Sequence, residues 1–222
     1  MSASAMVAGF GAAFIATHLL MSHPLRQPLA KRLGNAGFQA LYSVIALVTF
    51  GGMVWARKGA GPEPLLWQPQ PWAWIVAAFL TWSAAMLLVG SFRRNPAMVT
   101  FGPGSEVKIG APSGVFRITR HPMMWGFALW AISHILVHPE PSAITLALVV
   151  LIMALAGSAG QDVKKRRHLG VAWEQWVART SFMPFGRGLH GPGAFAAVGG
   201  TLLWLGATWL HPMPVGLWQW LA

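Results

Sequence analysis

Residues 114–139 read GVFRITRHPMMWGFALWAISHILVHP, a basic segment that passes through Arg120, His121 and Pro122 into a run rich in Trp, Met and Phe. Pro122 fits the first turn of a helix, where its missing N–H would have no partner in any case. The same proline disfavours the helical conformation for His121, so we expect this histidine at or just before the helix start. The positive end of the helix dipole disfavours an imidazolium there, which leaves a neutral ring with a lone pair for a metal or a haem iron.

The composition indicates a protein whose solvent is the lipid bilayer. Of its 222 residues, 55% are hydrophobic and only 9% are charged, whereas a soluble domain carries about 25% charged residues. The absence of cysteine excludes disulfides, thiolate ligands and iron–sulfur clusters. The formal net charge of +11 does not indicate nucleic-acid binding, because the basic residues lie between apolar runs, as loops do under the positive-inside rule.

Six apolar segments are each close to the ~20 residues that a transmembrane helix needs: about residues 4–22, 37–56, 72–91, 122–138, 142–160 and 194–212. All of the 16 basic residues except Arg57 and Lys58 fall in the loops that follow the first, third and fifth segments. These loops should be cytoplasmic, which puts both termini on the outer side. We therefore predict an all-α, polytopic membrane helical bundle that forms a single domain over residues 1–222.

Two of the cytoplasmic loops have features of their own. The loop at 92–121 is long and rich in Gly and Pro, contains Glu106 and leads directly to His121, and long loops of this kind are often functional. In the loop at 161–193, Asp162 precedes a run of basic residues. This segment either binds an anion or pairs internally, or, as we favour, it only anchors the membrane topology. We also expect a short amphipathic helix on the inner leaflet, with an apolar face made of Val171, Trp173, Trp176 and Val177.

Two histidines lie at matching depth in this topology. His18 is about four residues, or roughly 6 Å along a helix, from the inner end of the first segment, and His121 lies at the inner end of the fourth. Polar rings at such depth face other helices rather than lipid. Two histidines from separate helices can ligate one metal or both faces of a haem. The alternatives are an interhelical hydrogen bond for His18 and a capping or headgroup contact, shared with Arg120, for His121.

The other candidate groups allow fewer conclusions. His134 and His138 lie one helical turn apart and share a face, and with His211 they would make a second metal site. We prefer the alternative that His138 and His211, each followed by proline, end their helices at the membrane interface. His134 lies deep enough to need a partner. No two carboxylates are spaced to share one helical face, so acid/base catalysis by a carboxylate pair has no support. No nucleotide-binding or zinc-protease motif occurs either.

Three blocks of the chain resemble the NnrU family of bacterial membrane proteins: THLLMSHPLRQPLAKRLGNAGFQALYS (17–43), RITRHPMMWGFALWAISHIL (117–136) and LGVAWEQWVARTSFMPF (169–185). The family is named for an association with denitrification and nitric oxide metabolism, and the resemblance implies a multi-pass protein of the bacterial inner (cytoplasmic) membrane. The family is similar to the plant and cyanobacterial 15-cis-ζ-carotene isomerase, a membrane protein that uses haem b and is active when the iron is reduced.

This resemblance implies a b-type haem in the present chain. The matching residues are His18 with Leu25 and Arg26 in the first block, and Arg120, His121 and Pro122 in the second. They make His18 and His121 the expected axial ligands, with His134 in reserve. Arg26 and Arg120 would pair with the haem propionates, because a guanidinium fork matches a carboxylate. The cysteine discussed as an alternative ligand in the isomerase has no counterpart here, where Thr119 precedes the tripeptide.

Two functions follow from the resemblance, and a third is an alternative. The haem would serve redox-dependent double-bond isomerisation of an apolar substrate, or it would bind nitric oxide in a sensory or accessory role. The Arg-His-Pro tripeptide and the later Trp-Glu segment also resemble the isoprenylcysteine carboxyl methyltransferases, which use S-adenosylmethionine. Those enzymes carry a pair of acidic residues after the penultimate helix, where this chain has Asp162 and then Lys164 and Lys165, and this difference disfavours the methyltransferase.

Overall fold

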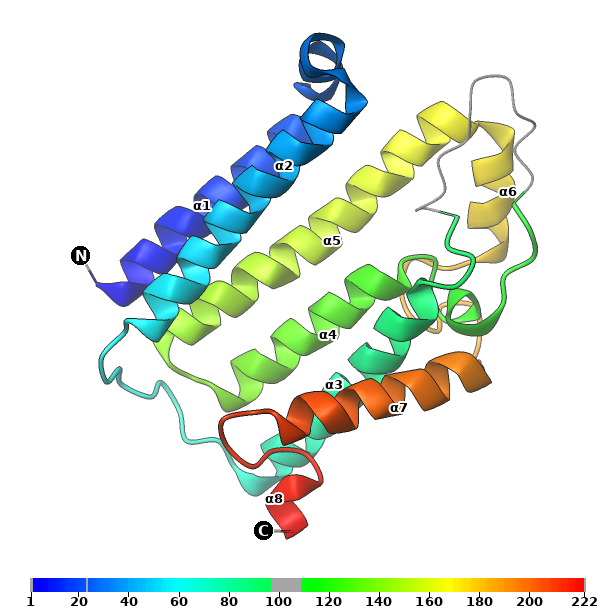
Figure 1. The fold of residues 1–222 in the computed structure, drawn as a ribbon. Helices are drawn as coiled ribbons and strands as arrows, with labels where there is room; N and C mark the ends of the chain where they lie inside the picture. Colours follow the sequence, from blue (N-terminus) through cyan, green and yellow to red (C-terminus); the bar gives the residue numbers. More distant parts are fainter. Residues whose placement is uncertain (1, 23, 97–108, 222) are drawn as a thin grey trace. The chain divides into compact units, whose positions relative to one another are not determined.

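The computed structural model describes residues 2–22, 24–96 and 109–221, and every regular element within these ranges is helical. The elements in chain order (Figure 1) are α1 Ala3–Ser22, α2 Arg26–Lys58, α3 Pro71–Ser91, the 3-10 helix η1 Gly114–Arg117, α4 Pro122–Val137, α5 Pro141–Leu169, α6 Val171–Arg179, α7 Ala194–Trp209 and α8 Trp218–Leu221. The predicted all-α fold is confirmed. The central part of the loop at 92–121, with Glu106, lies outside the described residues.

Each predicted membrane segment falls on one apolar helix. Four of them, α1, α2, α3 and α5, are long and apolar enough to cross a membrane. The other two, α4 and α7, are apolar but have only 16 residues each. At 1.5 Å per residue such a helix is about 24 Å long, several ångströms less than the ~30 Å of a bilayer's hydrocarbon core. The chain is therefore a polytopic helical membrane protein whose fourth and sixth apolar helices are short.

Two helices extend beyond the segments that hydrophobicity marks. α2 begins at Arg26 rather than near residue 37, and Gly34, with a φ of 71°, interrupts its helical backbone. Glycine tolerates this left-handed conformation because it has no Cβ. α5 continues to Leu169, so the basic residues 164–167 lie on a helix and not in a loop. Lys and Arg have high helix propensity, so a helix can continue through them beyond its apolar part. A search for apolar residues finds only the part of such a helix that crosses the membrane.

Contacts between residues group the chain into two compact units. The first contains Met1–Pro69 and His134–Met153, and the second contains Gln70–Ser133 and Ala154–Ala222. The helices α4 and α5 each supply residues to both units. The single domain predicted over residues 1–222 stays a prediction.

In the first unit, α1 packs along α2 (Figure 1). Its buried apolar cluster consists of Val7, Met53, Ala56 and Val149. Small residues let the backbones approach closely, as is common between membrane helices. A Cβ added to Gly11 of α1 would lie 2.5 Å from Cγ2 of Val149 in α5. A side chain at position 11 would therefore collide with Val149 unless the valine moved.

Glu63, in the loop after α2, connects helices at one end of the first unit. Its carboxylate accepts hydrogen bonds from Ser4 Oγ (3.2 Å), Ser142 N (3.0 Å) and Ser142 Oγ (2.5 Å). Arg57 at the end of α2 pairs with Glu140 at 3.6 Å. The start of α1, the end of α2 and the start of α5 thus meet at the same end of this unit. Helices that alternate in direction across a membrane require this arrangement.

We expect Glu63→Gln to lower the stability at neutral pH and to weaken its dependence on acid. Burial raises the pKa of Glu63, but the hydrogen bonds from Ser142 and Ser4 and the charge of Arg57 outweigh it, so the pKa lies below its ordinary value of 4.5. A carboxyl whose pKa is lowered on folding stabilises the protein above the unfolded-state pKa, and the contribution is lost as the pH falls through the folded-state value. Thermal unfolding in detergent should therefore show a smaller loss below about pH 4.5 in the variant than in wild type. The control is Glu174→Gln at an exposed pair, and equal acid sensitivity of all three proteins would refute the prediction.

In the second unit, α3 and α7 pack side by side (Figure 1). Two tryptophan–threonine hydrogen bonds cross this contact: Trp82 Nε1 donates to Thr201 Oγ1 (2.9 Å) and Trp204 Nε1 donates to Thr81 Oγ1 (3.0 Å). A Cβ on Gly200 would lie 2.4 Å from Cα of Met86. Small residues and hydrogen-bonding side chains together are the usual means by which membrane helices associate.

The core of the second unit corrects the prediction for α6. The amphipathic helix exists, but Trp173 and Trp176 are buried, with 0% and 2% of their surface exposed, while Val171 is 74% exposed. The two indoles belong to a core cluster whose other members are Leu87, Val115, Phe116, Ile118 and Ala196. Their face therefore packs against protein and does not lie on the inner leaflet. An apolar stripe has the same sequence pattern in both situations.

Candidate functional site

The start of α4 holds His121 where the sequence analysis placed it. α4 begins at Pro122, and His121 precedes it. The carbonyl of His121 accepts the first helical hydrogen bond, from Trp125 N at 3.0 Å. Its own amide bonds Thr119 Oγ1 at 3.3 Å. His121 is thus fixed on both sides by its backbone, which limits the positions that its ring can reach.

Residues after α6 hold this segment in place. Arg120 N donates to Ser181 O at 2.8 Å, and Thr119 Oγ1 donates to Phe182 O at 2.7 Å. Trp125, one turn into α4, donates from Nε1 to the same Phe182 carbonyl at 2.8 Å. The backbone near Arg120 is therefore bound to residues about 60 positions later in the chain, as the separations of 57 to 63 residues in these side-chain bonds show.

Asp162, on α5, accepts hydrogen bonds from both Arg120 and His121. Arg120 donates to Oδ2 from Nε (2.9 Å) and Nη2 (2.6 Å) and to Oδ1 from Nε (3.1 Å), and His121 Nε2 lies 2.9 Å from Oδ1. The His121 side chain is 0% exposed, and those of Arg120 and Asp162 are each 12% exposed. Asp162 therefore pairs internally, one of the alternatives left open by the sequence, and forms a buried three-residue site. The role of this segment as a topology anchor stays a prediction. A bidentate arginine–carboxylate pair gives such a site a defined geometry as well as charge balance.

Phe182 covers two members of this site. Its ring centroid lies 5.3 Å from that of His121 in an edge-on arrangement. The guanidinium carbon of Arg120 lies 5.3 Å from the same ring centroid. Such a contact contributes a favourable cation–π interaction. Phe182 lies in the block at 169–185, but nothing local distinguishes it from other apolar residues of the loop, so the sequence alone indicates no role for it.

One nitrogen of His121 has no hydrogen bond from any residue that the structure describes. A carboxylate can only accept, so Nε2 carries the hydrogen that Asp162 receives. Nδ1 is buried and has no hydrogen-bond partner in the part of the chain that the structure describes. In a neutral ring this nitrogen holds the lone pair. A metal-bound histidine typically donates from its other nitrogen to a carboxylate or a carbonyl. His121 therefore fits a ligand of a metal or a haem iron through Nδ1.

His18 also fits a ligand, through its other nitrogen. Its Nδ1 lies 2.9 Å from the carbonyl oxygen of Phe14, one turn earlier in α1, so Nδ1 carries the hydrogen and Nε2 the lone pair. The ring contacts the side chains of Phe14 and of Tyr42 in α2, with centroid distances of 4.0 Å and 5.0 Å. It faces a neighbouring helix, as expected. The hydrogen bond runs within α1 and is not the interhelical bond of the alternative interpretation.

The remaining predicted cofactor residues have partners of their own. Arg26 is exposed at the start of α2, and its guanidinium carbon lies 5.7 Å from the centroid of the Phe38 ring. The rings of His134 and His138 are stacked at 5.7 Å, which confirms that they share a face. His18, Arg26 and His134 belong to the first unit, and Arg120 and His121 belong to the second. Their roles toward a haem stay predictions.

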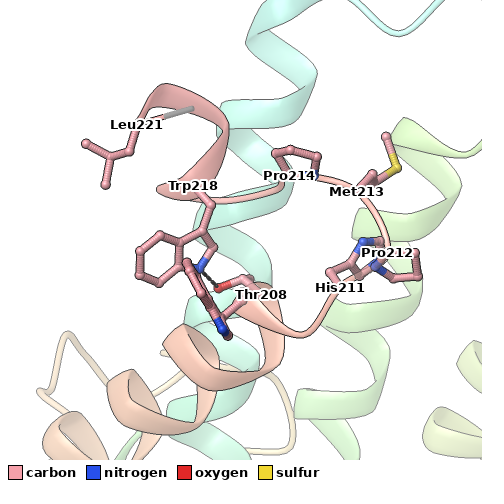
Figure 2. Close-up of a pocket in the computed structure, with 8 residues that line it drawn as sticks. Thr208, His211, Pro212, Met213, Pro214, Trp218 and Leu221 are labelled. Carbon is pink, nitrogen blue, oxygen red and sulfur yellow. Dashed lines mark hydrogen bonds between the residues drawn. The ribbon is translucent and has the colours of Figure 1, made fainter.

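His211 lines a pocket where the C-terminal residues fold back on the end of α7 (Figure 2). Trp218 closes one side and donates from Nε1 to Thr208 Oγ1 at 3.0 Å. The other lining residues are Trp209, Pro212, Met213, Pro214 and Leu221. α4 ends at Val137 and α7 at Trp209, so His138 and His211 follow helix ends, as we preferred. Among the described residues, no group of three or more His, Cys, Asp or Glu side chains is placed to hold a metal ion.

The helices and the buried site define a polytopic helical membrane protein with an Arg–His–Asp cluster at the start of one helix. The chain belongs to the NnrU family, whose model, described as NnrU protein, matches residues 5–219. It is 30% identical over 112 residues to the chloroplastic 15-cis-zeta-carotene isomerase of Zea mays, a match that covers 46% of this chain and 31% of that protein.

A second match, to the chloroplastic 15-cis-zeta-carotene isomerase of Arabidopsis thaliana, is 33% identical over 73 residues and covers 33% of this chain and 20% of that protein. The matches thus span less than a third of each relative's length. No solved structure matches the chain. The methyltransferase alternative gains no support from these comparisons, and its acidic position is occupied here by Asp162, both of whose oxygens accept internal hydrogen bonds.

Proposed function

We propose that the chain is a b-type haem protein of the bacterial inner membrane that isomerises a double bond in an apolar, lipid-soluble substrate in a redox-dependent way. The observation that carries the proposal is the buried His121 ring, whose Nε2 is held by Asp162 while Nδ1 has no partner among the described residues. Family membership and the two isomerase relatives support the choice of reaction.

His18 and His121 would hold the haem, through Nε2 and Nδ1 respectively, with His134 as the reserve. Bound haem supplies a redox-active iron whose potential depends on its axial ligands and on their hydrogen bonds. Arg26, exposed at the start of α2, is available to a propionate. Arg120 uses two of its nitrogens on Asp162. Its main role in the proposal is therefore to hold Asp162, with a propionate contact as a secondary one.

The substrate class follows from the surface of the helices. Large apolar side chains are exposed along α2 and α7, among them Leu47, Val48, Leu202 and Leu203. Exposed apolar side chains on membrane helices contact lipid, so a substrate dissolved in the bilayer reaches the protein without entering water. A conjugated polyene has these solubility properties, and the names of the two relatives indicate one.

A haem-based role in nitric oxide metabolism is the second candidate. It is favoured by the extent of the family match, which spans residues 5–219, whereas the isomerase matches cover less than half of the chain. Such a role requires only that the iron bind a gas. If nitric oxide displaces one histidine from the iron and no polyene is converted, the role in nitric oxide metabolism is indicated. Conversion of a polyene that requires a reductant would indicate the isomerase.

The visible absorption spectrum of the detergent-purified protein tests the haem proposal. We expect a Soret band and low-spin reduced α and β bands, with His18→Ala and His121→Ala each becoming high-spin or losing the haem. His168→Ala is the matched control, because His168 is exposed near the end of α5 and should leave the spectrum unchanged. A wild-type protein that stays colourless after haem supplementation during expression would refute the proposal.

A further inference from the structure

We infer that Asp162 is a positioning residue for His121: it holds the Nε2–H form of the ring, and Arg120 holds Asp162 in turn. The inference rests on the proposed function where it concerns the haem, but its first part concerns the protein alone. A neutral histidine can carry its hydrogen on either nitrogen, and the hydrogen bond at one nitrogen decides which nitrogen is free to bind a metal. In this site Asp162 makes that choice.

The geometry excludes the other tautomer. With the hydrogen on Nδ1, the lone pair of Nε2 would face Oδ1 of Asp162 at 2.9 Å, and two acceptors would repel each other. The buried Nδ1–H would have no acceptor within the described ranges. A buried donor that lacks an acceptor destabilises the folded protein. Burial of the ring, which leaves no side-chain surface exposed, prevents water from supplying the missing bond.

Arg120 keeps the carboxylate of Asp162 in one orientation. Its Nε donates to Oδ2 at 2.9 Å and to Oδ1 at 3.1 Å, and its Nη2 donates to Oδ2 at 2.6 Å. The guanidinium thus holds both oxygens, and Oδ1 also accepts from His121. The Arg120 backbone is bound to Ser181, so its side chain starts from a fixed point. The network therefore runs from Arg120 through Asp162 to His121, with Asp162 as the member that both others contact.

The hydrogen bond from His121 to Asp162 would affect the reduction potential of an iron bound at His121. A carboxylate that accepts from the far nitrogen raises the basicity of the ligand nitrogen. A more basic ligand favours the ferric over the ferrous state and lowers the reduction potential. The charge of Arg120 moderates the effect, because the guanidinium withdraws electron density from the same carboxylate. Asp162 and Arg120 would thus set the potential at which a redox-dependent reaction begins.

The experiment uses the full-length protein with Asp162→Asn, Asp162→Leu and Asp162→Glu, and with Glu174→Gln as the control that removes an exposed carboxylate. Asn keeps an acceptor and removes the charge, Leu removes both, and Glu restores both at a slightly greater length. Helix content by circular dichroism and elution in detergent identify variants that fail to fold. The two measurements are the ¹⁵N chemical shifts of the His121 ring without haem, assigned with His121→Gln, and the reduction potential with haem.

We expect the wild-type ring to be protonated at Nε2 only, and a mixture of tautomers in Asp162→Leu. With haem, Asp162→Asn should have a higher reduction potential than wild type, Asp162→Leu should bind haem about 10–100-fold more weakly, and Asp162→Glu should recover much of both properties. Glu174→Gln should match wild type throughout. Results of this kind would establish the positioning role, because a merely structural residue would not change the potential of a folded protein.

Two results would overturn the inference, and they are distinguishable from failure of the proposed function. A wild-type His121 protonated at Nδ1, or a haem potential that is unchanged in folded Asp162→Asn, would show that Asp162 does not position the ring, while the haem spectrum would still support the proposed function. A wild-type protein that binds no haem would refute the proposed function and the part of the inference that concerns the potential.

Discussion

Arg120→Leu should destabilise the protein by about 3–5 kcal/mol, because it removes one partner of a mostly buried ion pair and leaves Asp162 with His121 alone. The Arg120 and Asp162 side chains are each only 12% exposed, so water cannot replace the guanidinium. The interaction with the face of Phe182 is lost as well. Unfolding of the purified protein by added denaturing detergent, followed by circular dichroism, would measure the change in the free energy of unfolding.

Arg166→Leu is the matched control for this prediction. It makes the same substitution in an ion pair with Glu174 whose side chains are each 52% exposed. Exposed pairs contribute about 0–1 kcal/mol, so the control should be nearly as stable as wild type. The double variant Arg120→Leu/Asp162→Leu should recover part of the loss, since no unpaired carboxylate is then buried. Equal effects of Arg120→Leu and Arg166→Leu would show that burial of the site does not matter.

The parts of the fold that depend on local chemistry could be predicted from the sequence. Pro122 restricts its own backbone and that of the preceding residue, so the start of α4 and the place of His121 follow from sterics alone. The apolar helices follow from the length of hydrocarbon that a helix must cross. The extension of α5 to Leu169 was missed, since its last turns are polar and only their helix propensity indicates them.

The candidate site could be predicted only in part, because its members come from distant positions. His121 was identified from its proline and Arg120 from its neighbour, but Asp162 is 42 and 41 residues away from them in the sequence. Several basic residues follow Asp162 in the sequence, and no local pattern shows which cation the carboxylate selects. The proposed joint role of His18 and His121 depends on their depth in the membrane, and it stays a prediction.

α6 shows why an amphipathic pattern does not identify the surface that it covers. Trp173 and Trp176 give the helix an apolar face, and this pattern fits a lipid surface as well as a protein core. The described structure places Phe116 against Trp176, with ring centroids 5.8 Å apart. Phe116 lies in η1, just before the Arg120 segment. Long-range contacts of this kind decide between the two surfaces, and a single sequence does not contain them.

Trp173→Ala should be the most destabilising single change in α6, with a loss of about 3–5 kcal/mol, because a fully buried tryptophan leaves a large cavity when it is truncated. Trp173 has 0% of its surface exposed and lies in the cluster that includes Val115 and Ile118. We expect the same denaturing-detergent titration to show this loss. Val171→Ala is the control in the same helix, and with 74% of its surface exposed it should change the stability by less than about 0.5 kcal/mol.

Trp173→Phe separates the packing of this residue from its hydrogen bonding. Trp173 Nε1 is buried with no hydrogen-bond partner in the described part of the chain, so replacing the indole by a phenyl ring removes an unsatisfied donor as well as some volume. The two effects oppose each other, and the variant should lose less than about 1.5 kcal/mol. A loss in Trp173→Phe as large as that in Trp173→Ala would mean that the indole N–H has a partner that stabilises the native state. The same loss in Trp173→Ala and Val171→Ala would instead show that α6 packs through its other face, as a helix lying on the lipid surface would require.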